Sequence, residues 1–178
     1  KEYRRQRQMC IRDRDNTAQI VKKYNSDKVF IEERAEKNGL GTAYVHGFNW
    51  ALKNEYDKII QMDADLSHDP KEVPDMFDLL DNYDLVIGSR YNNGLRVINW
   101  PISRLYISYF ANLYARIITG VPVKDLTAGF KGWKSEALHL INFNECSSQG
   151  YCFQIETSFR AHQKACKLVE HPIVFTAV

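Results

Sequence analysis

The sequence predicts an α/β domain in which a mostly parallel sheet is flanked by helices. Its 178 residues are enough for one such domain with a sizeable core. Hydrophobic residues make up 44% and charged residues 26% of the chain, a balance typical of globular proteins rather than disordered or fibrous ones. Segments with strand character alternate with segments of helical spacing, as they do in doubly wound sheets.

The predicted elements follow one another without an internal repeat or a linker. Helices are predicted at residues 16–24, 42–52 and 72–80, and strands at 28–31, 58–62 and 85–87. The strand at 58–62 runs into the sequence MDAD, and the strand at 85–87 runs into IGSR. Ligands of such sheets lie beyond the carboxyl ends of the strands, so both turns are expected to point to one site.

The acidic turn after the strand at 58–62 is the strongest local signal for chemistry. Asp63 and Asp65 flank one small residue within KIIQMDADLSHDP. Two carboxylates at a strand end can share Mg²⁺ or Mn²⁺ with a diphosphate, because these hard cations prefer oxygen ligands and often retain substrate oxygens. A bare Asp-x-Asp sequence also occurs in solvated turns and helix caps. We expect His68 to be structural or to support the two carboxylates from behind.

Residues 100–118 form a predicted amphipathic helix. Apolar residues recur there at helical spacing. The polar residues Arg104, Ser108, Asn112 and Arg116 lie four positions apart and share one face. Two interpretations stay open at this point. Either the helix packs on the sheet with a solvated polar face, or it lies at a membrane interface and presents Arg and Ser to a lipid phosphate.

Charge is distributed unevenly along the chain, although the formal net charge is only +2. Residues 1–14 carry six basic and two acidic side chains, which indicates either a nucleic-acid-binding arm or a foreign terminus, and we favour the terminus. Beyond residue 14 acids outnumber bases, so no nucleic-acid partner is expected. Residues 85–124 hold five basic and no acidic side chains, which suits an anionic ligand or membrane headgroups.

Cysteine usage and hydropathy indicate a reducing compartment. Cys10, Cys146, Cys152 and Cys166 form no CxxC pair and no zinc spacing, so free thiols are expected. The sequence contains neither a run of about 18 apolar residues that would span a bilayer nor a signal peptide at its start. We therefore expect a cytoplasmic protein.

Six segments together resemble the dolichyl- and polyprenyl-phosphate mannosyltransferases, which are family 2 glycosyltransferases of the GT-A fold. In family order over most of the chain, they are NGLGTAYVHGFNWAL, MDADLSHDP, DLVIGSRY, NWPISRLYIS, DLTAGFKGW and GYCFQIE. The resemblance implies inverting transfer of mannose from GDP-mannose to a polyprenyl (dolichyl-type) phosphate. It also implies Mg²⁺ or Mn²⁺ as the cofactor and peripheral attachment to the cytoplasmic face of a membrane. A separate membrane-anchoring subunit is compatible with it.

The resemblance assigns donor and metal roles to individual residues. Asp63 and Asp65 are implied to bind the metal and the donor diphosphate, with Asp65 also counted as catalytic. Gly39 and Gly41, in the glycine-bearing turn before the helix at 42–52, are assigned to binding of the nucleotide sugar.

The acceptor side is assigned in the same way. Arg90, Arg104 and Ser108 are implied to surround the lipid phosphate. Gln154 and Glu156, from FQIE, are implied to lie near the transferred sugar or to support the acceptor. Arg90, Gln154 and Glu156 are also counted among the catalytic residues.

The chain departs from the family pattern near its ends. The family's opening strand with its PTYNE-like segment is missing, and Cys10 and Ile11 stand where a second strand ends in two aspartates. The basic Gly-Ser-Lys loop that should follow residue 178 is missing as well. We therefore expect residues 1–14 to be foreign or disordered, and residues 15–178 to be an incomplete family 2 catalytic domain whose GT-A sheet is truncated at both ends.

Other functions stay open on the sequence. A family 2 transferase that uses UDP-glucose or another acceptor would share the acidic turn, although the QxxRW motif of processive polysaccharide synthases is absent. A nucleotidyltransferase would need a glycine- and basic-rich loop after its first strand. A truncated, inactive domain that docks to a membrane or a subunit is the non-enzymatic alternative.

Overall fold

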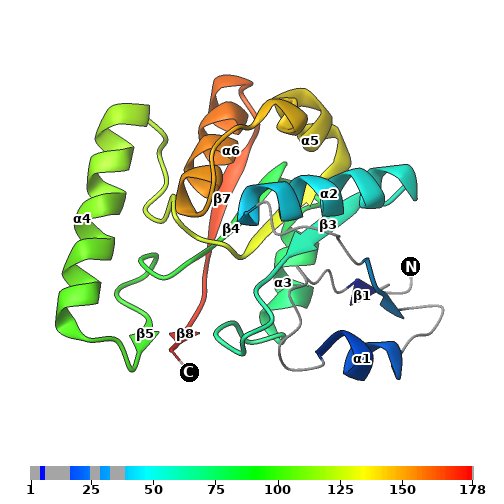
Figure 1. Cartoon of the computed structure of the whole chain (residues 1–178). Helices are drawn as coiled ribbons and strands as arrows, with labels where there is room; N and C mark the ends of the chain where they lie inside the picture. Colours follow the sequence, from blue (N-terminus) through cyan, green and yellow to red (C-terminus); the bar gives the residue numbers. More distant parts are fainter. Residues whose placement is uncertain (1–4, 7–16, 25–28, 33–38, 178) are drawn as a thin grey trace.

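A computed structural model describes residues 5–6, 17–24, 29–32 and 39–177 (Figure 1). The central sheet has the strand order β3-β6-β4-β7 and consists of β3 (Lys58–Gln61), β4 (Leu85–Ser89), β6 (Lys131–Lys134) and β7 (Leu168–Pro172). The longer helices are α2 (Leu40–Lys53), α3 (Glu72–Leu79), α4 (Ile102–Thr119), α5 (Ser135–Ile141) and α6 (Tyr151–Gln163). The shorter elements are β1 (Arg5–Gln6), α1 (Thr17–Lys22), β2 (Val29–Phe30), β5 (Val97–Ile98), the 3-10 turn η1 (Phe143–Glu145) and β8 (Phe175–Thr176).

The central sheet is mixed, although most of its strands share one direction. β6 lies antiparallel between β3 and β4, whereas β7 pairs with β4 in parallel. Among the strands of this sheet that the structure describes, β3, β4 and β7 therefore run the same way and β6 opposes them. The α/β prediction is confirmed, and so are the strands at 58–62 and 85–87. The sequence pattern does not indicate β6, because Lys and Gly are depleted in strands.

Helices cover both faces of the sheet (Figure 1). Leu85 and Trp133 face one side and pack with residues of α2, α5 and α6. Val86, the next residue of β4, faces the opposite side and packs with Met76 of α3. This alternation follows from the two-residue period of a strand. The two apolar layers fix β3 and β4 between them, so the turns that follow these strands are held in place.

α4 lies at one edge of the molecule, apart from the sheet (Figure 1). Its buried residues are Asn112 and Ala115. Asn112 attaches the helix to the segment before β6, since its Nδ2 donates to Thr127 Oγ1 (3.1 Å) and its Oδ1 accepts from the Leu126 amide (2.8 Å). The helix ends at Gly120, whose φ of 69° is the left-handed conformation that glycine adopts freely at this position.

The exposed side of α4 is strongly apolar. We call it the α4 apolar face, and it consists of Ile102, Tyr106, Ile107, Tyr109, Phe110, Leu113, Tyr114, Ile117 and Ile118. The interpretation in which this helix packs on the sheet with a solvated polar face is therefore wrong, because polar Asn112 points into the protein and the apolar side chains point out. In the part of the chain that the structure describes, no helix combines the length and hydropathy needed to cross a bilayer.

The N-terminal region is described only in part. Arg5–Gln6 pairs in parallel with β2, and α1 matches the helix predicted at 16–24. The other residues of the segment 1–14 lie outside the described residues. The prediction that this segment is foreign or disordered, and that residues 15–178 form an incomplete domain, therefore stays a prediction.

Candidate active site

A cavity of about 130 Å³ lies beyond the carboxyl ends of β3 and β4. Its charged and polar lining includes Asp63, Asp65, His68, Arg90, Arg104 and Gln154. These residues come from the turn after β3, the end of β4, α4 and α6. The expectation that the MDAD and IGSR turns point to one site is therefore met, and two further predicted residues join them there.

The carboxylate pair follows β3 directly. Asp63 is held by Tyr44 of α2, whose hydroxyl donates to Asp63 Oδ1 over 3.1 Å. Gly129 leaves room beside it, since a Cβ at that position would lie 3.2 Å from Asp63 Oδ2. Burial, followed by the nearby charge of Asp63, raises the pKa of Tyr44, so this hydroxyl keeps its proton and remains a donor.

Asp65 is exposed, and one of its oxygens is already fixed. Asp65 Oδ1 accepts hydrogen bonds from the amide and the hydroxyl of Ser67. The hydrogen bond from the Ser67 side chain is the main cause that lowers the pKa of Asp65, so this side chain is ionised at neutral pH. Two carboxylates that flank one residue at the mouth of a cavity form a hard oxygen donor set that fits Mg²⁺ or Mn²⁺.

Arg90 is buried and already paired. Its Nε and Nη2 donate to the two carboxylate oxygens of Asp125 (both 2.7 Å), and Nη2 also donates to Thr127 Oγ1 (2.7 Å). Asp125 is fully buried and also accepts from the Arg90 amide (3.0 Å). Of the positive charge in the acid-free window 85–124, the charge of Arg90 is thus neutralised by Asp125, the first residue after that window. Among the described residues Nη1 has no hydrogen-bond partner, which leaves a contact with a phosphate as a prediction.

Arg104 reaches the same cavity from α4. It is exposed, and its guanidinium lies over the ring of Trp100, 4.5 Å from the centroid. The Arg90 guanidinium lies 5.3 Å from the same centroid, so Trp100 contacts both arginines. Within the described residues Arg104 has no acidic partner. It is therefore a cation at the cavity that remains available to an anion.

Ser108 does not line this cavity. Its hydroxyl accepts a hydrogen bond from the Tyr91 hydroxyl over 2.7 Å, one helical turn after Arg104. The two arginines thus lie at one cavity, while Ser108 supports the residue next to Arg90, and the assignment of all three to a lipid phosphate stays a prediction.

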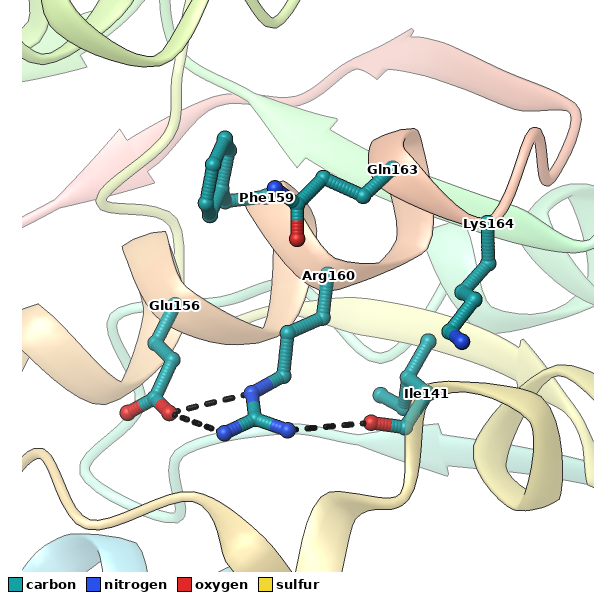
Figure 2. Close-up of a pocket in the computed structure, with 6 residues that line it drawn as sticks. All are labelled: Ile141, Glu156, Phe159, Arg160, Gln163 and Lys164. Carbon is teal, nitrogen blue, oxygen red and sulfur yellow. Dashed lines mark hydrogen bonds and ion pairs between the residues drawn. The ribbon is translucent and has the colours of Figure 1, made fainter.

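Gln154 and Glu156 lie on different faces of α6. Gln154 is buried and lines the cavity. Glu156 turns toward a separate hollow of about 400 Å³, shown in Figure 2, where its Oε1 accepts from Arg160 Nε (3.0 Å) and its Oε2 accepts from the Ser148 amide (3.0 Å). Two positions along a helix correspond to a turn of about 200°, so both side chains cannot face one cavity. The structure does not bring Glu156 to the candidate site, in contrast to the catalytic role expected for it.

The glycines Gly39 and Gly41 pack against the loop before α6. A Cβ on Gly39 would come within 2.3 Å of Gln149 Oε1, and a Cβ on Gly41 within 2.6 Å of the Ser148 carbonyl oxygen. Gln149 Oε1 also accepts from the Gly41 amide over 3.1 Å. Both glycines are therefore explained by close packing, while Leu40 between them lines the cavity. Their assignment to binding of the nucleotide sugar stays a prediction.

Tyr44, His68 and Asp125 shape the site although none of them was predicted to bind a ligand. Tyr44 sits within an ordinary helical pattern, and His68 is buried, with its ring packed on Phe130 and Phe175. Burial lowers the pKa of His68 and favours its neutral form. Asp125 has the most accessible signal, because it is the first acid after a long acid-free window.

A second group of potential metal ligands lies elsewhere. Glu72 and Asp75 of α3 and His171 of β7 bring one ligand atom each to within 4.8 Å of the others. Glu72 and His171 already bond to each other over 2.7 Å, and none of the three lines the cavity. The contact between Glu72 and His171 accounts for the closeness of these two side chains without a metal.

Comparison with known proteins agrees with this architecture. A structure from Desulfovibrio desulfuricans G20, described as a nucleotide-diphospho-sugar transferase, superposes with a TM-score of 0.59 over 97% of this chain and 60% of that one, at 14% identity. The chain therefore shares its fold with this structure.

The sequence matches are more specific. The model of "Glycosyl transferase family 2" matches residues 12–141. The chain is 44% identical over 151 residues to a polyprenol monophosphomannose synthase of Mycolicibacterium smegmatis, and 41% identical over 147 residues to an undecaprenyl-phosphate mannosyltransferase of Micrococcus luteus. These alignments cover 84% and 83% of this chain but 57% and 60% of the two relatives. This chain belongs to glycosyl transferase family 2, and the resemblance to polyprenyl-phosphate mannosyltransferases is confirmed.

Proposed function

We propose that the protein transfers mannose from GDP-mannose to a polyprenyl phosphate with inversion at the anomeric carbon. The observation that carries this proposal is the cavity that joins two carboxylates with an unpaired arginine, beside an exposed apolar helix. The names of the two relatives, which both mention mannose and a polyprenyl lipid, support the choice of substrates.

On the donor side, Asp63 and Asp65 would hold Mg²⁺ or Mn²⁺. The cation, when bound, would neutralise the charge that develops on the departing nucleoside diphosphate. Tyr44 keeps Asp63 in position, and Ser67 does the same for Asp65. These contacts leave the remaining oxygens of both carboxylates available at the cavity.

On the acceptor side, the phosphate itself is the nucleophile. A phosphate monoester is largely dianionic at neutral pH, since its second pKa is about 6. One of its oxygens forms the bond to the anomeric carbon while the bond from that carbon to the diphosphate oxygen breaks, which inverts the configuration. Neither step needs a protein base, so the chain's task is to position the two substrates and balance their charges. Arg104 is placed to bind the acceptor phosphate through paired donors.

The α4 apolar face is the proposed membrane contact. It lies on the same helix as Arg104, and the window 85–124 around it has no acidic residue in sequence. Tyr, Ile and Phe side chains insert favourably at the boundary of headgroups and acyl chains, and nearby arginines attract anionic lipids. A helix that lies on the bilayer would bring the lipid phosphate to the cavity while the polyprenyl chain stays in the membrane.

The first prediction tests the acceptor role. Arg104→Ala is expected to lower mannose transfer from GDP-mannose into butanol-extractable lipid about ten- to a hundred-fold, because one charge-assisted contact to the phosphate is lost. The affinity for GDP, measured by titration calorimetry, should not change. The loss of transfer should appear when the rate is measured as a function of the concentration of the lipid acceptor.

Arg116→Ala is the matched control, because Arg116 is an exposed arginine on the same helix that does not line the cavity. Equal losses in both variants would assign the effect to general charge.

Tighter binding of UDP than of GDP, together with transfer from UDP-glucose, would move the function to a glucosyl transferase.

The second prediction tests the membrane contact. The wild-type protein is expected to co-sediment with vesicles of phosphatidylcholine and phosphatidylglycerol, and Ile107→Asp combined with Ile117→Asp should abolish most of that binding. Both positions are more than two-thirds exposed, at 71% and 72%, so the substitutions leave the core intact.

Leu140→Asp, at an exposed position of α5, serves as the control and should bind vesicles like the wild type. Undiminished vesicle binding by the double variant would refute the membrane contact. A concentration-dependent dimer that the double variant abolishes, seen by analytical ultracentrifugation without vesicles, would instead assign this face to a second copy of the chain.

A further inference from the structure

A chain of three buried side chains runs from the sheet to the cavity. The indole Nε1 of Trp133, in β6, donates to Gln61 Oε1 over 3.2 Å. Gln61, the last residue of β3, uses its Nε2 to donate to the Gly129 carbonyl (2.9 Å) and to Gln154 Oε1 (3.0 Å). Trp133, Gln61 and Gln154 are each more than nine-tenths buried.

The order of donors and acceptors in this chain is fixed by chemistry. An indole nitrogen can only donate, and a backbone carbonyl can only accept. The Gln61 atom that faces Trp133 must therefore be the oxygen, and the atom that faces Gly129 must be the nitrogen. That nitrogen also faces Gln154, so Gln154 must present its oxygen to Gln61. Trp133 and the Gly129 carbonyl thus require the same orientation of the Gln61 amide, and Gln61 in turn sets the orientation of the Gln154 amide.

This orientation leaves the nitrogen of the Gln154 amide, Nε2, without a contact to Gln61. That nitrogen is buried at the cavity and has no hydrogen-bond partner among the described residues. Tyr44 lines the same cavity, and the amide lowers the pKa of its hydroxyl against the larger effects of burial and Asp63, but Nε2 has no hydrogen-bond partner in the described part of the chain. Burial of a donor without a partner is unfavourable, which favours a ligand that supplies the acceptor.

The backbone of Gln154 is fixed as well. Lys131 of β6 is fully buried, and its Nζ donates to the Gln154 carbonyl (2.7 Å), Ser158 Oγ (2.9 Å) and Thr157 Oγ1 (3.3 Å). Three acceptors match the three donors of an ammonium group. β6 thus holds the backbone of α6 at Gln154, and Gln61 orients the side chain of the same residue.

We propose that Gln61 and Trp133 are positioning residues that lock the Gln154 amide with its Nε2 toward the cavity, as a donor to an oxygen of the bound sugar. The inference rests on the proposed transfer from a sugar nucleotide. Gln154 provides the contact, and Gln61 acts only through it. The cavity therefore presents a fixed hydrogen-bond donor next to the carboxylate pair, with an orientation set by the sheet behind it.

The test is a double-mutant cycle between Gln61 and Gln154, with GDP-mannose and GDP as probes in titration calorimetry. Gln154→Ala should weaken binding of GDP-mannose about three- to ten-fold, the effect of one neutral hydrogen bond. Gln61→Leu should weaken it similarly, because the Gln154 amide can then turn over. The double variant should be no weaker than Gln154→Ala alone. Binding of GDP, which lacks the sugar, should change less than about two-fold in all three variants.

Gln163→Leu, an exposed glutamine on the same helix, is the control and should leave both affinities unchanged. Additive losses in the double variant, or equal losses for GDP and GDP-mannose, would overturn the proposal and reduce Gln61 to a packing role. A wild-type protein that binds no GDP-mannose would contradict the proposed function instead.

A measurement without ligand tests the lock by itself. In the wild-type protein the side-chain amide protons of Gln154 should give nuclear Overhauser contacts to Tyr44, and those of Gln61 should not. In Gln61→Leu the Gln154 contacts should weaken as the amide samples both orientations. Unchanged contacts in that variant would show that Gln61 does not set the orientation.

Discussion

Replacing Asp65 with asparagine is expected to reduce mannose transfer at least about a hundred-fold while leaving the unfolding midpoint unchanged. Asparagine keeps an oxygen that accepts from Ser67, so the turn should persist. It removes the negative charge that would hold the divalent cation against the donor diphosphate. Initial rates with GDP-mannose at saturating Mg²⁺ or Mn²⁺, together with thermal unfolding curves, provide the two readouts.

Asp78→Asn is the appropriate control, because Asp78 is an exposed acid on α3 that does not line the cavity. Its transfer rate should equal that of the wild type. Near-normal transfer by Asp65→Asn would reduce the acidic turn to a structural feature. A large fall in the unfolding midpoint would mean that Asp65 acts on the fold, and the assignment to the metal would lose its support.

Replacing Arg90 with alanine is expected to lower the free energy of unfolding by about 3–5 kcal/mol, which would be the largest stability effect in this region. The substitution leaves the Asp125 carboxylate fully buried without its cation. It also removes the donors to both carboxylate oxygens and to Thr127. Urea unfolding at neutral pH measures the loss directly.

The control is again Arg116→Ala, which removes an exposed arginine and should change the free energy of unfolding by less than about 0.5 kcal/mol. Combining Arg90→Ala with Asp125→Ala should cost less than the sum of the two single changes, because no unpaired charge then stays buried. A loss below about 1 kcal/mol in Arg90→Ala would show that water reaches Asp125 and that the pair is not a structural anchor.

Sequence reasoning located the candidate cavity because its position follows from the strand ends. Once the runs at 58–62 and 85–87 are read as parallel strands, Asp63 and Arg90 must lie near the same edge of the sheet. The pairing of Arg90 with Asp125 could not be predicted from the sequence, because Asp125 comes from a loop whose path depends on tertiary structure. A window without acids therefore overstated how much positive charge is free.

The orientation of α4 could not be predicted for a different reason. Helical spacing identifies two faces, but it does not say which of them meets the protein. Asn112, in the middle of the polar face, can be buried because it forms four hydrogen bonds, to Ser108, Thr127 and the amide of Leu126 among them, whereas Arg104 and Arg116 of the same face stay exposed. Such a network replaces the hydrogen bonds to water that burial removes.

Lys131 shows a similar limit. Lysine is rarely buried, so the segment around it does not suggest a central strand. Burial lowers the pKa of Lys131 to about 7. The Lys131 Nζ donates its hydrogen bonds to hydroxyl and carbonyl oxygens rather than to a carboxylate. Those acceptors belong to α6, and their arrangement is visible only when β6 and α6 are in contact.

The position of β6 also has a kinetic consequence. β3 and β4 are both made before β6, yet neither pairs directly with the other, and each needs β6 to complete its hydrogen bonds. Lys58 pairs with Lys134 and Leu85 pairs with Leu168, so the sheet depends on contacts between residues distant in sequence. Such contacts close long loops and slow folding. During synthesis, the edges of β3 and β4 that β6 will cover therefore stay open to association until residues 131–134 are made, and the other edge of β4 stays open until β7 is made.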